Sequence, residues 1–145
     1  MKQLLAAAAL FCVTTMGLAA TNIDLVDYSN SVKCLAEVMY RESRGEPLKG
    51  KLAVGKVVMN RVQHPLYPKT ICKVIFQPGQ FSWVSTFRRF KAPEEFRQIA
   101  KVILDGNHDL QDFNATHFHA RYVAPKWNRL KRIAIIGNHI FYQQL

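Results

Sequence analysis

The chain has 145 residues, of which 49% are hydrophobic and 21% charged, with seven glycines and six prolines. This length suits one compact domain, and this composition excludes a disordered, collagenous or coiled-coil chain. Twenty Lys and Arg against ten Asp and Glu give a formal net charge of +10. Such an excess indicates an acidic partner, for which nucleic acid, anionic lipid and a carboxylate-rich polymer are the candidates.

The first twenty residues are typical of a secretory signal. Lys2 supplies a positive start, residues 4–20 are uncharged, and small residues at positions 17, 19 and 20 suit a signal peptidase. We therefore expect residues 1–20 to be a signal peptide and the protein to be exported, to the periplasm or the cell exterior. Two alternatives are a buried N-terminal helix and a releasable membrane anchor, for which this weakly apolar run is marginal in length. Export argues against nucleic acid as the partner, and any membrane contact would be transient, through residues 1–20.

The cysteines agree with export. Cys12 lies in the expected signal, so its removal leaves Cys34 and Cys72. An even pair of cysteines in a small exported domain predicts one disulfide, with two buried free thiols as the alternative. If the signal is retained, Cys12 becomes a spare thiol that could compete for either partner.

The first predicted helix begins at Ser31, after a polar lead-in over residues 21–30, and ends at the turn formed by Gly45 and Pro47. Its apolar residues recur at helical spacing and would form the buried face: Val32, Leu35, Ala36 and Met39. The opposite face carries two i,i+4 pairs of unlike charge and is expected to be exposed; its members are Lys33, Glu37 and Arg41.

Helical spacing also predicts a second helix over residues 48–62 and a third from Pro93 to Gly106. Residues 70–76 form a short apolar segment, helix or strand, and residues 77–92 a long aromatic loop. Between residues 115 and 123 the pattern alternates, which predicts a strand with His117 and His119 on one face. A short basic helix over 128–136 and a terminal strand over 139–142 follow. The fold class is therefore mainly α (α+β), with a small β element.

Glu42 is the strongest catalytic candidate by position. It continues the apolar stripe of the first helix, beside a glycine turn, where desolvation would raise the pKa of its carboxyl. A carboxyl that keeps its proton near neutral pH suits general acid cleavage of a glycosidic bond. The alternative is a structural Glu that caps the turn or pairs with Arg44 or Arg61. Glu46 is expected to face solvent or brace the turn, because a glycine and a proline interrupt the helix there.

Other side chains leave the chemistry open. Three histidines could hold zinc with an open fourth position, or be satisfied by ordinary hydrogen bonds: His117, His119 and His139. Three aromatic residues could stack against sugar rings or bases, or belong to the core: Trp83, Tyr122 and Trp127. After Asp112 the chain has five Lys or Arg and no acid, which indicates either a solvated surface or a contact for a polyanion.

The order of the motifs resembles one known family, the SleB/CwlJ-type cell wall hydrolases. That family shows an E-A-x-G-E turn followed by G-x-x-A-V-x-x-V-x-x-N-R-V. The chain matches this pattern at residues 34–46, CLAEVMYRESRGE, and at residues 50–62, GKLAVGKVVMNRV. The likeness returns at 67–75, 80–83, 115–120, 125–127 and 136–142, so it covers nearly all of residues 31–145. Ser43 replaces the usual Ala, which is a small change.

The resemblance implies a single lysozyme-like domain over residues 31–145, related to resuscitation-promoting factors and lytic transglycosylases. It implies cleavage of the MurNAc–GlcNAc bond of peptidoglycan, without metal or other cofactor, by Glu42, the first Glu of the turn. Glu42 would protonate the glycosidic oxygen and then act as base while the sugar's own C6 hydroxyl attacks C1. Attack by water instead, giving a muramidase, is left open. The expected setting is a small secreted or phage-borne lytic enzyme (an endolysin), acting as a monomer.

Further site residues are suggested by the resemblance and by their chemistry. The residues expected to bind substrate are Glu46, Gln80, Phe81, Ser82, Trp83, His117, Tyr122 and Trp127. Asn60 and Arg61 are interpreted mainly as structural, orienting the Glu42 turn. Two other functions are compatible with the sequence: a zinc-dependent N-acetylmuramoyl amidase that uses the three histidines, and a basic module that binds peptidoglycan without cutting it.

Overall fold

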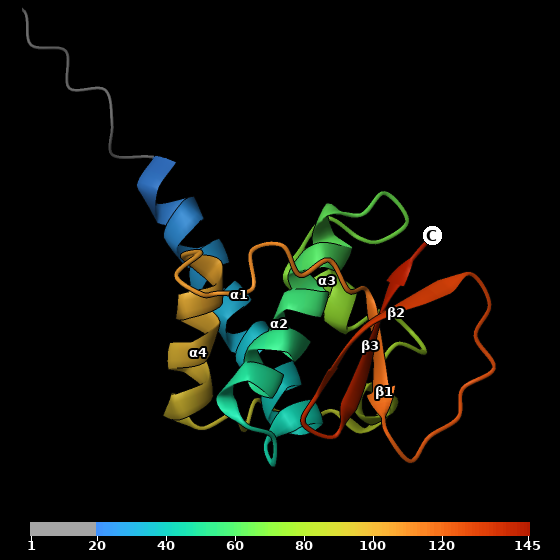
Figure 1. Ribbon diagram of the computed structural model, residues 1–145. Helices are drawn as coiled ribbons and strands as arrows, with labels where there is room; N and C mark the ends of the chain where they lie inside the picture. The colour runs from blue at the N-terminus through green and yellow to red at the C-terminus, as the bar shows by residue number, and fades with distance from the viewer. Residues whose placement is uncertain (1–19) are drawn as a thin grey trace, which may run out of the picture.

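The computed structural model describes residues 20–145, so the expected signal peptide lies outside the described residues except for Ala20. The elements follow the order α1 (Ala20–Ser43), α2 (Leu48–Gln63), α3 (Ile71–Ile75), the 3-10 helix η1 (Ser82–Thr86), α4 (Glu94–Leu104), β1 (His117–Ala120), β2 (Leu130–Ile136) and β3 (His139–Gln144). Figure 1 shows the helices grouped together with the small sheet at their side. The predicted fold class, mainly helical with a small β element, is confirmed.

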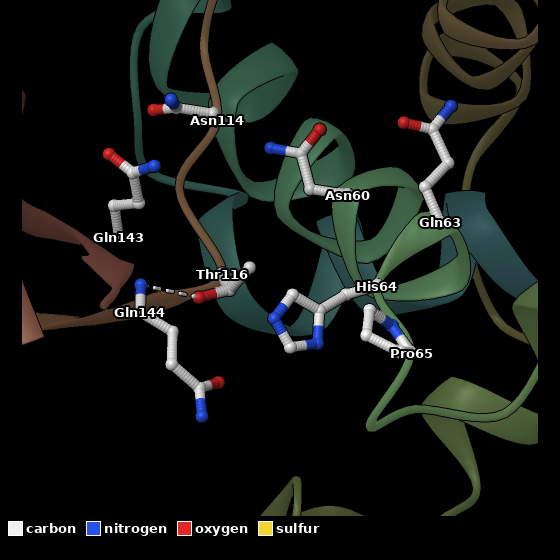
Figure 2. Close-up of a pocket in the computed structure, with 8 residues that line it drawn as sticks. All are labelled: Asn60, Gln63, His64, Pro65, Asn114, Thr116, Gln143 and Gln144. Atoms are coloured by element: carbon white, nitrogen blue, oxygen red, sulfur yellow. Dashed lines mark hydrogen bonds between the residues drawn. The ribbon is translucent and has the colours of Figure 1, made fainter.

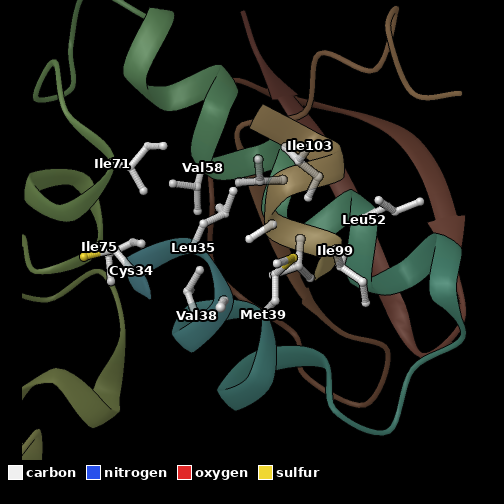
Figure 3. Packing of buried hydrophobic residues seen from close by; sticks show 14 of the residues in the cluster. Cys34, Leu35, Val38, Met39, Leu52, Val58, Ile71, Ile75, Ile99 and Ile103 are labelled. Atoms are coloured by element: carbon white, nitrogen blue, oxygen red, sulfur yellow. The ribbon is translucent and has the colours of Figure 1, made fainter. Parts of the chain in front are cut away.

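Helix α1 is the centre of the fold, because α2, α3 and α4 all pack against it. Residues 34–39 are all buried, so this part of α1 has no solvent face. Figure 3 shows Leu35 and Met39 of α1 among apolar side chains of the other helices, such as Val58 of α2 and Ile99 of α4. Burial of each large apolar side chain contributes roughly 1.5–3 kcal/mol, which fixes the C-terminal end of α1 firmly in place.

The prediction that Glu37 faces solvent is wrong. Its side chain is fully buried, and its carboxylate accepts hydrogen bonds from the backbone N–H groups of Lys91 (2.6 Å) and Ala92 (2.9 Å). The expected i,i+4 pair is present, since Arg41 Nε donates to Glu37 at 2.6 Å. The segment before α4 covers this face of α1, and a carboxylate is tolerated there because charged and backbone donors satisfy it.

The expected polar lead-in is also helical, since α1 already begins at Ala20. No glycine or proline interrupts residues 20–43, so the helix extends toward the N-terminus once its C-terminal half is packed. Tyr28 donates a hydrogen bond to Asp105 at the end of α4, at 3.0 Å. Across residues 20–145, no helix has the length and apolar character needed to cross a bilayer.

The remaining helices agree closely with the helices predicted from the sequence. Helices α2 and α4 lie within a residue or two of their predicted bounds. The undecided apolar segment is helix α3, whose N-cap Thr70 accepts a hydrogen bond from the backbone N–H of Lys73. The aromatic loop is confirmed, and it includes the 3-10 helix η1.

The sheet is antiparallel with the strand order β1–β3–β2. Strands β1 and β3 are confirmed, although β1 is limited to four residues. The predicted basic helix over 128–136 is wrong, because residues 130–136 form β2. Its isoleucines favour a strand, and Gly137, with φ +57°, makes the tight turn to β3.

The predicted disulfide is confirmed. Cys34 of α1 is bonded to Cys72 of α3, with 5.4 Å between the Cα atoms and a sequence separation of 38. The bond therefore joins the central helix to a helix that is only one turn long. A short helix has little stability of its own, so its position depends on this link and on its buried side chains.

Removing the disulfide should lower stability without removing the fold's core. In a Cys12→Ser background, Cys34→Ala together with Cys72→Ala should decrease the free energy of unfolding by about 3–4 kcal/mol, because the unfolded chain regains loop entropy. Urea unfolding followed by circular dichroism measures this difference. Dithiothreitol should shift the unfolding midpoint of the Cys12→Ser protein but not that of the triple variant; equal shifts in both would contradict the prediction.

Candidate active site

Glu42 lies in the last turn of α1, where the buried helix reaches the surface. Its Oε1 accepts a hydrogen bond from the indole Nε1 of Trp83 at 2.7 Å. Burial raises the pKa of the Glu42 carboxyl, and this effect outweighs the Trp83 hydrogen bond and the positive charge of Arg61, which both lower it. The carboxyl therefore keeps its proton to a higher pH than an exposed Glu, as the sequence predicts.

Two cavities meet at Glu42. The first, of about 300 Å³, is lined by Glu42, Arg61, Gly79, Gln80, Phe81, His117, Phe118 and Trp127. The second, of about 500 Å³, is lined by Glu42, Glu46, Ala120, Arg121, Tyr122, Asn138 and His139. Because the same carboxyl lines both, a groove between the helices and the sheet extends to either side of it. We call this pair of cavities the Glu42 groove.

Most of the expected binding residues lie at the Glu42 groove. Gln80, Phe81, His117 and Trp127 line its smaller cavity, and Glu46 and Tyr122 line its larger one. Trp83 reaches the site through its hydrogen bond to Glu42. Ser82 lines an adjoining pocket that shares Gly79 and Phe81 with the smaller cavity, and its contact with substrate stays a prediction.

The far wall of the smaller cavity is aromatic and uncharged. The His117 ring lies 5.4 Å from the Trp127 ring, and its Nδ1 is 3.0 Å from Thr116 Oγ1. Burial, together with the positive charges of Arg61 and His64, lowers the pKa of His117 to about 4. His117 is therefore a neutral hydrogen-bonding group near pH 7, while the 42% exposed Trp127 offers a face for stacking.

The three histidines proposed as a zinc site are not brought together. In the β1–β3 register, His139 pairs with Ala120, which directs it to the face opposite His117 and His119. Its ring contacts Phe118 at 5.2 Å. Within residues 20–145, no cluster of three or more His, Cys, Asp or Glu is arranged to hold a metal. The three-histidine zinc site is therefore wrong.

Glu46 braces a turn, as expected, but the turn belongs to the sheet. Its two carboxylate oxygens accept hydrogen bonds from the backbone N–H of Asn138 (2.8 Å) and from the Asn138 side chain (3.2 Å). His139 Nδ1 lies 3.9 Å away, and burial lowers the pKa of His139, so the two residues do not form an ion pair near neutral pH. Glu46 thereby ties the end of α1 to the β2–β3 hairpin.

Several residues of the groove are missing from the sequence-based set. Arg61 is buried and structural, as expected, since its Nε donates to the Thr116 carbonyl at 2.7 Å, but it also lines the groove beside Glu42. Asn138 and His139 reach the larger cavity only because the hairpin folds against α1. The Gly-Asn pair between two apolar runs is a hairpin signal that predicts the turn, but not its packing against α1.

A third pocket lies away from Glu42 and has a different character. Figure 2 shows this pocket of about 290 Å³, lined by Asn60, Gln63, His64, Pro65, Asn114, Thr116, Gln143 and Gln144. Asn60 is structural, as expected: its amide donates to the carbonyls of Phe113 and Ala115, each at 2.8 Å. No carboxyl lines the pocket, and His64 is its one titratable side chain. The Glu42 groove is thus the better candidate for chemistry.

A mainly helical domain with a small antiparallel sheet and a groove between them is of the lysozyme-like class that the sequence predicts. The chain belongs to the Cell Wall Hydrolase family, whose profile matches residues 45–142. Glu42 lies just before the matched range, whereas all the other residues that line the Glu42 groove lie within it. The expected family and fold are therefore confirmed.

Characterised relatives and solved structures agree with this assignment. The spore cortex-lytic enzyme of Bacillus subtilis (strain 168) is 31% identical over 117 residues, which are 78% of this chain and 37% of that enzyme. The catalytic domain of the Bacillus cereus SleB protein has a TM-score of 0.68 and 33% identity, covering 79% of this chain and 91% of that domain. The catalytic domain of the germination-specific lytic transglycosylase SleB from Bacillus anthracis gives the same score and identity, with 94% of that domain covered. The chain spans little more than a third of the full Bacillus subtilis enzyme.

Gly137 should be intolerant of any side chain, because a Cβ there would overlap Glu46 Oε2. Gly137→Ala must displace Glu46 from Asn138 in addition to straining a residue of positive φ. Gly106→Ala is the matched control, since Gly106 has φ +73° and open space around it. We expect Gly106→Ala to cost about 1–2 kcal/mol and Gly137→Ala about 1–2 kcal/mol more, for the lost hydrogen bonds. Thermal and urea unfolding measure both; equal losses would contradict the prediction.

Proposed function

We propose that this protein is a peptidoglycan glycosidase that cleaves the MurNAc–GlcNAc bond as a lytic transglycosylase, with Glu42 as its acid and base. The observation that carries this proposal is a half-buried carboxyl of raised pKa placed where two cavities meet. A glycan chain that fills both cavities would have a glycosidic oxygen next to this carboxyl. Membership of the Cell Wall Hydrolase family supports peptidoglycan as the substrate.

In the first step, Glu42 gives its proton to the glycosidic oxygen. The Trp83 N–H occupies Oε1, which leaves Oε2 to carry the proton of the neutral acid. As the C1–O bond breaks, positive charge develops on the MurNAc ring and negative charge on Glu42. The Trp83 hydrogen bond and the charge of Arg61 both stabilise the carboxylate formed at that moment.

In the second step, the same carboxylate acts as the base. The C6 hydroxyl of the MurNAc ring attacks C1, and Glu42 takes the hydroxyl proton. The product is a 1,6-anhydro sugar, and Glu42 is neutral again. The reaction needs one carboxyl, in contrast to the pair of carboxyls used by most glycosidases.

The state of Glu46 favours this mechanism over attack by water. Glu46 is the one other acid that lines the two cavities of the groove. Both of its oxygens already accept hydrogen bonds from Asn138, and its side chain is only 7% exposed. A carboxylate held in this way is poorly placed to activate a water molecule. The Bacillus anthracis relative, which is named as a lytic transglycosylase, supports the same choice.

The proposal also covers where the protein acts and how it is attracted to its substrate. A chain of net charge +10 is attracted to a wall polymer rich in lactyl and stem-peptide carboxylates, and this attraction weakens with salt. We propose that the protein is exported to the periplasm or cell exterior and acts there as a monomer without a cofactor. Residues 1–20 would be a cleaved signal peptide or a releasable anchor.

Replacement of Glu42 tests both the site and the reaction. Glu42→Gln should keep the fold and reduce release of soluble fragments from purified peptidoglycan by at least about a thousandfold, because the amide cannot donate the proton. Mass spectrometry of the parent protein's products should show disaccharides ending in 1,6-anhydro-MurNAc.

Glu94→Gln is the matched control, because Glu94 is an exposed carboxylate in the first turn of α4. It should retain full activity. Full activity of Glu42→Gln would refute the assignment, and binding to walls without any fragments from the parent protein would favour a non-catalytic binding module. Reducing-end sugars would indicate hydrolysis, and free stem peptides with intact glycan would indicate an amidase.

The hydrogen bond from Trp83 should set the alkaline limit of activity. Its donation lowers the pKa of Glu42, so Trp83→Phe should raise that pKa further. Because the general acid must be protonated, the alkaline limb of the kcat/KM profile should move to higher pH. Trp127→Phe removes an indole that lines the groove without bonding to Glu42, and it should leave this limb in place. A limb that moves equally in both variants would contradict the prediction.

A further inference from the structure

The proposed reaction leaves the buried carboxylate of Glu37 without a role. Its two oxygens have different partners. Oε2 accepts the backbone N–H groups of Lys91 and Ala92, whereas Oε1 accepts Arg41 Nε at 2.6 Å. The backbone bonds fix the carboxylate in place, so Glu37 cannot follow Arg41 if that side chain moves. It is therefore a rigid anchor for the guanidinium.

Arg41 in turn lies against the aromatic residue that binds Glu42. Its Cζ is 4.7 Å from the centre of the Trp83 ring system and 5.7 Å from that of Phe87. A guanidinium held over an indole face is an attractive contact that restricts rotation of the ring. The Nε1–H of the same indole donates to Glu42 at 2.7 Å. An unbroken series of contacts thus leads from the fixed Glu37 carboxylate, through Arg41 and Trp83, to Glu42.

We propose that Glu37 and Arg41 are positioning residues, which hold Trp83 in the orientation that binds one oxygen of Glu42 and leaves the other free for the substrate. Neither residue lines the groove, so neither touches substrate. The consequence for the rate rests on the proposed function of Glu42, whereas the effect on Trp83 and on the charge of Glu42 does not.

The anchor also controls charge. Arg41 precedes Glu42 in the chain, and an unpaired guanidinium beside a carboxyl favours ionisation and lowers its pKa. The adjacent Glu37 carboxylate offsets the Arg41 charge, which helps Glu42 keep its proton. The other titratable groups at the groove are on α2, on the sheet and on the segments after α1 and β1: Arg61, His117, His139, Glu46, Arg121 and Tyr122. None of these is altered by the replacement of Glu37, so a shift arises from the lost Glu37 charge, from Arg41 or from Trp83, and the addition of Arg41→Met separates the Arg41 contribution from the other two.

The chain provides a direct probe, since Trp83 and Trp127 are its only two tryptophans. In a Trp127→Phe background, fluorescence comes from Trp83 alone. Ionisation of Glu42 changes the electric field at the hydrogen-bonded indole, so a pH titration without substrate should show a step at the Glu42 pKa. Glu42→Gln in this background should abolish the step and thereby identify it.

Glu37→Gln is the test, and Glu94→Gln is its control with the same change of net charge. In Glu37→Gln the unbalanced Arg41 charge lowers the fluorescence midpoint, whereas weakening of the Trp83 hydrogen bond raises it, so we expect a displaced midpoint together with stronger acrylamide quenching of Trp83. We expect kcat to fall roughly tenfold with KM within about twofold, because the acid is misplaced while the groove is unchanged. Glu94→Gln should change none of these. Adding Arg41→Met removes the unbalanced charge, so the midpoint should rise relative to that of Glu37→Gln, and kcat should stay low.

If Glu37→Gln folds and has the same fluorescence midpoint and kcat as Glu94→Gln, the proposal is overturned. Glu37 would then only fix the backbone of residues 91–92. If Glu37→Gln does not fold, Arg41→Met decides, because Arg41 is partly exposed. This variant should show stronger acrylamide quenching of Trp83 and a reduced kcat, and unchanged values would overturn the proposal. A shifted midpoint in Glu37→Gln together with full activity of Glu42→Gln would support the positioning role and refute the proposed function.

Discussion

The burial of residues 34–39 of α1 on every side is the constraint on which the rest of the structure depends. Helices α2, α3 and α4 pack around residues 34–39, and the disulfide at Cys34 fixes α3 to the same stretch. A helix enclosed in this way has few conformational alternatives. Its C-terminal end is therefore held rigidly at the point where Glu42 leaves the core. Catalytic geometry that depends on fractions of an ångström is best built on such an element.

Complete burial of a helix creates a difficulty for any charged residue on it. Glu37 is tolerated because backbone N–H groups and Arg41 satisfy its carboxylate, and a buried carboxylate without them would cost several kcal/mol. The surroundings of Glu42 are different: its carboxyl accepts one hydrogen bond from a neutral donor, Trp83, and the charge of Arg61 acts on it from farther away. Five residues apart on one helix, one carboxylate is bound by three donors, whereas burial raises the pKa of the other. The difference arises entirely from what packs against each of them.

The sequence predicts what depends on local pattern and spacing, and it fails where distant segments decide. Helices α2 and α4, the disulfide and the position of Glu42 follow from periodicity, capping residues and an even pair of cysteines. Glu37 has the spacing of an exposed helix face, and only the return of residues 91–92 over α1 buries it. Residue type alone groups His139 with His117 in a zinc site, whereas the strand register places the two side chains on opposite faces of the sheet. Residues 128–136 are basic, which suggests a helix, although the isoleucines among them favour the observed strand.

The basic residues that follow Asp112 have different surroundings in the folded chain. Arg121 lines the Glu42 groove, where its positive charge would act at short range on a bound polymer. Lys131 and Arg132 are exposed on β2, an edge strand of the sheet, where charged side chains prevent pairing with another chain. Under the proposed function, their contribution to substrate attraction would be long-range and salt-sensitive, while that of Arg121 would depend on contact. Under the proposed function, net charge would draw the wall polymer toward the protein, and the groove with its desolvated carboxyl would decide which bond is cut.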